Sequence, residues 1–298
     1  MTGSQFDGIF PPISTPFVEG KLSPEAVIKN LDRLCRTGIR GVVVLGSNGE
    51  AALLSQIEKK ILIETVIRSS PNEMTIIAGT GCESTEETIR LTKECGEMGA
   101  HAALVLPPFY YWDKMTDEVL YRHYSTVADH SRIPVLLYNV PKFTHFRISP
   151  GLVARLSAHE NIAGIKDSSA DPVLLADYIY AAGSVSDFKV LVGTATVLFA
   201  GLALGCTGGI MALANVTPEL CVDLYHFMKQ GDFEKARALQ MKLIPLGKAV
   251  TTTYGVAGLK AAMEMAGYFG GDPRLPLLPV TLKEKDAIRN LMTEAGLL

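Results

Sequence analysis

The stretch from Ile133 to Asp167, IPVLLYNVPKFTHFRISPGLVARLSAHENIAGIKD, contains one structural repeat of the chain. It opens with the apolar run Ile133–Tyr138, continues through a loop and a helical segment, and ends in a second apolar run, Ile162–Ile165. Apolar runs with little alternation are typical of parallel strands that are covered on both faces. The stretch therefore predicts a strand, a connecting helix and a second strand parallel to the first.

The same repeat extends along most of the chain. Apolar runs, Gly- or Pro-marked loops and amphipathic helices follow one another at intervals of roughly 30 residues, the length of a strand–helix–strand unit. The runs are Ile9–Ser14, Gly41–Leu45, Met74–Ala78, Ala102–Leu106, Ile133–Tyr138, Ile162–Ile165, Phe188–Val192 and Thr207–Met211. Because eight such units close a barrel, the sequence predicts the α/β class and a (β/α)8 TIM barrel.

The strand pattern stops after Asn215, and the chain from Thr217 to Leu298 has the pattern of helices. We therefore expect residues 1–228 to form the barrel with the catalytic site, and residues 229–298 to form a C-terminal helical extension. An open doubly wound sheet is the alternative architecture, but Gly79-Thr80-Gly81 is not completed to a dinucleotide-binding fingerprint, because Ser84 occupies the place of the third glycine.

Composition excludes several classes of function. The 298 residues are 48% hydrophobic and carry a formal charge of −3, which disfavours a nucleic-acid binder. Val190–Val216 has no charged residue and is long enough to cross a bilayer, but its glycines and threonines favour buried strand, helix and strand. Met1–Phe10 lacks the pattern of a signal peptide, and the five cysteines have no metal-binding spacing, so we expect a cytoplasmic protein without a metal.

Two reactive side chains stand at predicted strand ends, where barrel enzymes place their chemistry. Tyr138 closes the fifth strand and Lys166 closes the sixth, so the two could share one pocket. Burial favours the neutral amine, which is the form that attacks a carbonyl to give a Schiff base. The alternatives are a lysine that reaches solvent or pairs with Asp167, and a tyrosine that only lines the barrel. Lys260 also has apolar neighbours, and its helical context predicts that its amine reaches solvent.

Two further segments are candidates for the site. The turn Gly46–Glu50, GSNGE, follows the second strand, and its backbone amides could hold a carboxylate while Ser47 relays a proton. An ordinary loop is the alternative. Pro107–Trp112 is rich in aromatic residues, which is typical of packing or of a contact between subunits.

Three motifs occur in the order and spacing of one family: Gly46–Glu50, Tyr138–Pro141 and Gly164–Asp167. From about Gly8 to its C-terminus the chain resembles the dihydrodipicolinate synthase / N-acetylneuraminate lyase family of class I pyruvate-type aldolases. The resemblance implies a TIM barrel with a C-terminal helical extension and a homotetramer. It also implies small-molecule substrates, a 2-oxo acid and an aldehyde, with no cofactor other than the covalent imine between the substrate and a lysine.

The resemblance also implies roles for single residues. Lys166 would form the Schiff base with pyruvate or a related 2-oxo acid, and Tyr138 would relay protons. Ser47 would supply the second hydroxyl of that relay, and Tyr110 would reach into the site of a neighbouring subunit.

Four residues are expected to contact the substrate. Asn48 belongs to the carboxylate-binding turn, and Ser168 follows the reactive lysine at a position where one branch of the family has a serine that contacts substrate. Gly193 closes the seventh strand, and Ile210 lies in the eighth, where the backbone is expected near the lysine.

The sequence leaves the second substrate open. The synthase pattern Y-N-V-P-x-R-T-G has an arginine for the carboxylate of the aldehyde, but Phe143 stands there in this chain and His145 replaces the glycine. Lys142 is expected to point elsewhere. Together with the motifs around Ser168, this favours a 4-hydroxy-2-oxoglutarate or 2-keto-3-deoxy-sugar-acid aldolase. The alternatives are a 4-hydroxy-tetrahydrodipicolinate synthase that condenses pyruvate with aspartate semialdehyde, a regulatory barrel that binds a keto acid without turnover, and a metal-dependent aldolase.

Overall fold

The structure is a computed structural model of the chain and describes residues 5–183 and 187–298. Its centre is a parallel sheet of eight strands in the order β1-β10-β9-β8-β7-β6-β5-β4. These strands are β1 (Gly8–Phe10), β4 (Gly41–Val44), β5 (Thr75–Gly79), β6 (Ala102–Val105), β7 (Val135–Asn139), β8 (Ile162–Asp167), β9 (Lys189–Val192) and β10 (Gly208–Ile210). Each predicted apolar run overlaps one of them.

The two end strands of the sheet come together and make it a barrel. A parallel bridge joins Pro12 to Val43, and the amide of Ile13 donates to the carbonyl of Val43 over 2.9 Å. The predicted (β/α)8 TIM barrel is therefore confirmed. A separate two-stranded hairpin, β2 (Phe17–Val18) and β3 (Lys21–Leu22), follows β1.

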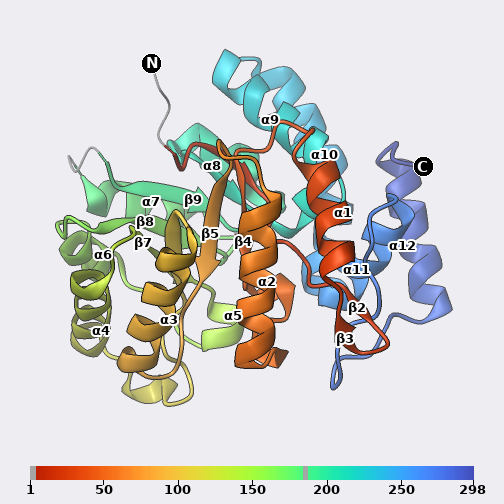
Figure 1. The fold of residues 1–298 in the computed structure, drawn as a ribbon. Coiled ribbons are helices and arrows are strands. Elements are labelled where there is room, and N and C mark those ends of the chain that lie inside the picture. Colours follow the sequence, from red (N-terminus) through yellow and green to blue (C-terminus); the bar gives the residue numbers. More distant parts are fainter. Residues whose placement is uncertain (1–4, 184–186) are drawn as a thin grey trace.

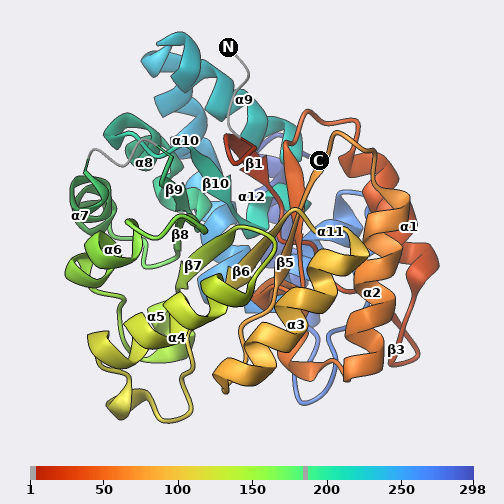
Figure 2. The ribbon, with the colours of Figure 1, turned by 60° about the vertical axis from the view of Figure 1, so that its left-hand side comes forward.

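Helices surround the strands on the outside (Figures 1 and 2). They are α1 (Pro24–Leu34), α2 (Gln56–Ser69), α3 (Thr85–Met98), α4 (Asp117–His130), α5 (Pro141–Thr144), α6 (Pro150–Leu156), α7 (Pro172–Ala182), α8 (Leu198–Leu204) and α9 (Pro218–Gln230). Short 3-10 turns lie at Ser47–Gly49, Ala51–Leu53, Trp112–Lys114, Ala195–Val197 and Ala212–Asn215.

The strands bury both of their faces, which explains their apolar sequences. In β7, Val135 and Leu137 pack outward against the helices, whereas Leu136 and Tyr138 belong to a second apolar cluster inside the barrel. Alternation along the strand thus separates the two cores, and the inward position at the end of β7 belongs to a tyrosine.

The uncharged stretch Val190–Val216 forms barrel core, as expected. It contains the end of β9, the helix α8 and the strand β10. Within residues 5–183 and 187–298, no helix has the length and apolar character needed to cross a membrane.

The C-terminal extension consists of α10 (Phe233–Lys248), a π-helical turn (Ala249–Thr253), α11 (Gly255–Met265) and α12 (Leu282–Glu294). In it, α10 packs against α9 of the barrel and α11 packs against α12, and the segment after α11 reaches α1. Asn30 of α1 fixes it there, because its side chain donates to the carbonyl of Phe269 and accepts from the amide of Phe269, both over 2.8 Å. The predicted division after residue 228 falls in the last turn of α9, and that division stays a prediction.

Candidate functional site

Lys166 and Tyr138 lie side by side at the C-terminal ends of neighbouring strands. Tyr138 of β7 is in register with Lys166 of β8, and the Nζ atom of Lys166 lies 4.2 Å from the centre of the tyrosine ring. Lys166 is only 3% exposed, so its amine does not reach solvent. The structure thus brings the two predicted reactive groups together inside the barrel.

The hydroxyl of Tyr138 is the centre of a polar cluster. Burial raises the pKa of Tyr138, but the charge of Lys166 and hydrogen bonds with Ser47, Ser168 and Lys166 outweigh burial and lower this pKa below its usual value. A phenol with a lowered pKa beside an amine can pass a proton to and from a reacting atom. Ser47 and Ser168 reach this hydroxyl from different loops, after β4 and β8 respectively.

Asp167 does not serve as the partner of Lys166, although it is the next residue. Its carboxylate is buried and accepts hydrogen bonds from the side chains of Asn139 and Ser169, both over 2.6 Å. Burial raises the pKa of Asp167, while these hydrogen bonds act in the opposite direction. Asn139 and Asp167 therefore tie the ends of β7 and β8 together on the side that faces away from the amine. Sequence reasoning missed this pair, although both residues directly follow the two residues it selected.

The turn Gly46–Glu50 carries Ser47 and Asn48 in a 3-10 conformation. Leu45, just before the turn, and Glu50, its last residue, both have left-handed backbone angles, with φ of 59° and 54°. Side chains other than glycine rarely adopt this conformation, and such strain is concentrated at functional sites. Asn48 is half-buried in this turn, and its expected contact with a substrate carboxylate stays a prediction.

The other substrate-binding candidates also lie at strand ends. The amide of Gly193 donates to the carbonyl of Asp167 over 2.6 Å. A Cβ atom at Gly193 would lie 2.1 Å from Oγ of Ser168, so only glycine leaves that hydroxyl its place. Ile210 ends β10 and packs in the inner cluster that contains Tyr138. Their roles toward a substrate stay predictions.

Tyr110 lies apart from this cluster, on the surface. It is 74% exposed, and its ring contacts Tyr111 edge-on, with ring centres 5.0 Å apart. The carboxylate of Glu83 fixes the segment by accepting from the amides of Phe109 and Tyr110, over 3.1 and 2.9 Å. The reach of Tyr110 into a neighbouring subunit's site, which the family resemblance implies, stays a prediction.

Lys260 differs from its expectation. The sequence predicts an amine that reaches solvent, but Lys260 is 1% exposed and forms an ion pair with Glu50 over 2.7 Å. The physical reason is a carboxylate more than two hundred residues earlier in the chain, which makes burial of the ammonium possible. Lys142 behaves as expected: its amine donates to the carbonyl of Thr251 over 3.1 Å and leaves Phe143 at the place of the synthase arginine.

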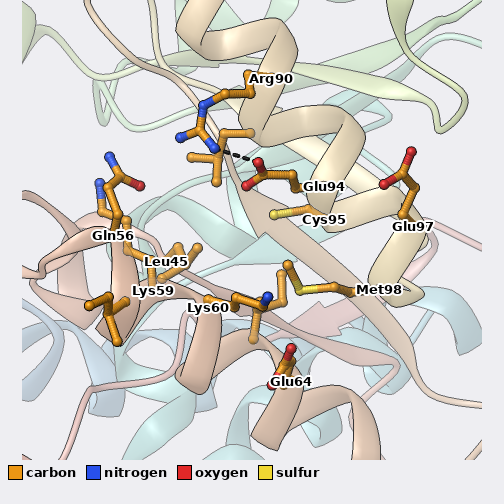
Figure 3. Close-up of a pocket in the computed structure, with 13 residues that line it drawn as sticks. Leu45, Gln56, Lys59, Lys60, Glu64, Arg90, Glu94, Cys95, Glu97 and Met98 are labelled. Carbon is orange, nitrogen blue, oxygen red and sulfur yellow. Dashed lines mark hydrogen bonds and ion pairs between the residues drawn. The ribbon is translucent and has the colours of Figure 1, made fainter.

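A surface groove of about 500 Å³ lies elsewhere, between α2 and α3 (Figure 3). Lys59, Lys60 and Arg90 line it together with Glu64 and Glu94, around an apolar floor. None of the predicted site residues lines this groove, so its size does not make it the reaction site. In the described part of the chain, no three His, Cys, Asp or Glu residues are grouped so that they could hold a metal ion.

The model of the dihydrodipicolinate synthetase family matches residues 5–295. The chain belongs to this family. A 4-hydroxy-tetrahydrodipicolinate synthase from Thermodesulfovibrio yellowstonii is 37% identical over 98% of this chain and 99% of its own length. The resemblance seen in the sequence motifs is therefore confirmed.

Solved structures of the dihydrodipicolinate synthetase family have the same fold. Dihydrodipicolinate synthase from Thermotoga maritima gives a TM-score of 0.95 at 31% identity, over 99% of this chain and 100% of its own. A prophage protein of this family from E. coli K12, in complex with pyruvate, gives a TM-score of 0.93 at 31% identity, over 99% and 100% of the two chains.

Membership fixes the class of chemistry. The chain is an enzyme, a carbon–carbon lyase of the class I pyruvate aldolase type, and enzymes of its family use a lysine Schiff base with pyruvate and need no further cofactor. A regulatory barrel without turnover and a metal-dependent aldolase are therefore the wrong alternatives. The matched relatives carry the synthase name, which supports the synthase alternative over the 4-hydroxy-2-oxoglutarate aldolase that the motifs favour.

Proposed function

We propose that this enzyme binds pyruvate as an imine of Lys166 and joins it to an aldehyde, with aspartate semialdehyde as the first candidate. The observation that carries this proposal is the buried Lys166 amine, 4.2 Å from the Tyr138 ring. The synthase name of relatives such as the 37% identical protein supports the choice of aldehyde.

The chemistry follows from these groups. The neutral amine of Lys166 attacks C2 of pyruvate to give a carbinolamine, which loses water to leave the protonated imine. The imine draws electrons from C3, so loss of a C3 proton gives an enamine, and the enamine carbon attacks the aldehyde carbonyl. Tyr138 moves the protons of these steps, and Ser47 and Ser168 orient its hydroxyl. Hydrolysis of the imine then releases the product and restores the amine.

Trapping of the imine tests this mechanism directly. The protein is incubated with pyruvate and sodium borohydride, and its intact mass and peptide masses are measured. We expect an irreversible gain equal to a reduced pyruvate adduct, on the peptide that contains Lys166. An adduct on another lysine, or none, would contradict the proposal.

A second candidate for the aldehyde substrate is favoured by one residue. Phe143, 44% exposed at the place of the synthase arginine, offers no bidentate partner for the carboxylate of aspartate semialdehyde. This favours 4-hydroxy-2-oxoglutarate or a 2-keto-3-deoxy sugar acid, which the enzyme would cleave to pyruvate and an aldehyde.

Two assays separate the candidates: condensation of pyruvate with aspartate semialdehyde, and pyruvate release from 4-hydroxy-2-oxoglutarate and 2-keto-3-deoxygluconate. The synthase proposal requires the condensation to have the higher kcat/KM. The variant Phe143→Arg is the matched probe. If the second candidate holds, this variant raises condensation and lowers pyruvate release.

We also propose that the enzyme is a homotetramer. The exposed aromatic side chains of Tyr110, Tyr111 and Trp112 support a contact between subunits at this surface. One matching solved structure is a monomeric dihydrodipicolinate synthase variant, so sedimentation of this protein decides the point. The cytoplasmic location expected from the sequence stays a prediction.

A further inference from the structure

A buried ion pair lies outside the reacting groups and joins the C-terminal extension to the barrel. Nζ of Lys260 in α11 lies 2.7 Å from Oε1 of Glu50, and both side chains are essentially unexposed. The same ammonium donates to the carbonyls of Thr15, over 2.9 Å, and Asp272, over 3.0 Å. One carboxylate and two hydrogen-bonded carbonyls thus surround the buried cation, an arrangement that offsets the cost of desolvation.

The second oxygen of Glu50 is also held from the C-terminal extension. Its Oε2 atom accepts from the backbone amide of Arg274 over 2.7 Å. The guanidinium of Arg274 is fixed in turn by Glu58, over 2.6 and 2.9 Å, and by the carbonyls of Leu53 and Gly20. Both carboxylate oxygens of Glu50 are therefore held from more than two hundred residues away, one by the ammonium of Lys260 and the other by the amide of Arg274.

Glu50 is also the last residue of the turn that carries Ser47. Its amide donates to the carbonyl of Ser47 over 3.2 Å, and Thr15 holds the same turn through the carbonyl of Gly49. Glu50 and Leu45 both keep left-handed backbone angles, which persist only where the surroundings impose them. The carboxylate clamp on Glu50 is such an imposed constraint.

We propose that Glu50 is a positioning residue for the reaction. Clamped by Lys260 and by the amide of Arg274, it holds the Gly46–Glu50 turn in the strained conformation that places the Ser47 hydroxyl on Tyr138. This inference rests on the proposed function, in which Tyr138 relays protons during imine and enamine formation. The C-terminal extension thereby takes part in the reaction through the turn.

The assay needs only pyruvate. Enamine formation exchanges the C3 protons of pyruvate, and NMR in D2O follows this exchange whichever aldehyde the enzyme uses. Glu50→Gln keeps the shape of the side chain but loses the charge and one acceptor. We expect it to slow exchange by about tenfold or more, because small displacements of a relay are costly.

A double-mutant cycle with Ser47→Ala separates positioning from a general loss of structure. If Glu50 acts through Ser47, Glu50→Gln slows exchange by less than about threefold once the hydroxyl is gone. Equal losses in both backgrounds would overturn the proposal. The pH profile gives a second readout: Glu50→Gln and Ser47→Ala should move the alkaline limb upward alike, because each removes the same hydrogen bond from Tyr138.

A control and a substitute variant keep the test decisive. Asn30→Ala removes the two hydrogen bonds that hold the extension on α1, without touching Glu50, Lys260 or Arg274, and should lower Tm while exchange stays within about twofold. If Glu50→Gln does not fold because the buried ammonium of Lys260 has lost its counter-ion, the double variant Glu50→Gln with Lys260→Met replaces it in the double-mutant cycle. Borohydride trapping on the unchanged enzyme distinguishes failure of the two proposals. If no adduct forms at Lys166, the proposed function is wrong. If the adduct forms but the rate losses of Glu50→Gln and Ser47→Ala are additive, only the role of Glu50 is wrong.

Discussion

Two lysines of this chain are buried to the same degree in opposite surroundings. Lys166 is 3% exposed and Lys260 1%, and the Nζ atom of each lies over an aromatic ring, 4.2 Å from Tyr138 and 4.5 Å from Phe17 respectively. Lys260 has the carboxylate of Glu50 at 2.7 Å. Around Lys166, no carboxylate in residues 5–183 and 187–298 lies within ion-pair distance. The lysines therefore differ in their counter-charge, and burial is common to both.

That difference separates a structural lysine from a chemical one. Burial lowers the pKa of Lys260, while the hydrogen bond and the charge of Glu50 act to raise it and hold the ammonium in place. A lysine with a permanent buried counter-ion is committed to that partner. Lys166 faces a phenol hydroxyl instead, so its amine is available to a substrate carbonyl.

The largest effect is expected from removing the amine that lacks a counter-ion. Lys166→Ala should lower turnover by on the order of 10³-fold or more, because the covalent step has no substitute. Borohydride trapping should disappear with it. Lys260→Met should still form the pyruvate adduct on the Lys166 peptide, provided it is assayed below its lowered Tm. An adduct that disappears in Lys260→Met and remains in Lys166→Ala would show that Lys260 is the reactive lysine.

The phenol beside Lys166 gives the next largest effect. Tyr138→Phe should slow pyruvate C3 exchange by about 10² to 10⁴-fold, the usual contribution of a positioned acid or base. Since Lys166 and its hydrogen-bonding neighbours hold the pKa of Tyr138 below its usual value, the alkaline limb of the rate profile should lie below pH 10. This limb should vanish in Tyr138→Phe. We expect that variant still to form the imine, more slowly, so that borohydride can trap it. An unchanged limb would show that another group titrates there.

For stability the order of the two lysines should be the opposite: replacing Lys260 should cost more free energy of unfolding than replacing Lys166. Lys260→Met leaves Glu50 buried and unpaired, and we expect urea unfolding to report a loss of about 3–5 kcal/mol. The double variant with Glu50→Gln should recover most of that loss, because no charge remains buried. Lys166→Ala strands no carboxylate and should cost less than Lys260→Met alone. Equal losses for the two lysines would mean that the ion pair contributes nothing.

The barrel follows from the sequence because its signals are local. Runs such as Ile133–Tyr138 are apolar on both faces, and the structure places an outward and an inward core on β7 accordingly. The predicted division after residue 228 rests on no comparable signal. It falls within α9, whose last residue, Gln230, is followed by a glycine in the left-handed conformation.

The site follows from the sequence only where strand ends define it. Lys166 and Tyr138 are adjacent because neighbouring parallel strands end together, which spacing predicts. The prediction that the amine of Lys260 reaches solvent is wrong because its partner, Glu50, is distant in the sequence. No periodicity connects a turn after β4 with α11. The residue types of that turn likewise do not predict its backbone strain, since the left-handed backbone of Leu45 is imposed by tertiary contacts.

His123 extends the comparison to a buried base without a counter-charge and without a substrate. Its Nδ1 atom lies 2.9 Å from the Thr85 hydroxyl, and burial lowers its pKa to about 4. Between pH 6.5 and 4 the unfolded chain therefore binds a proton at this residue that the folded chain does not bind. The free energy of unfolding is unaffected by His123 above pH 6.5 and falls as pH drops below it. The loss should reach about 3 kcal/mol near pH 4. Urea unfolding across this range checks it, with His123→Gln as the control: the variant should lose less stability on acidification, and parallel curves for the two proteins would show that His123 is not the group responsible.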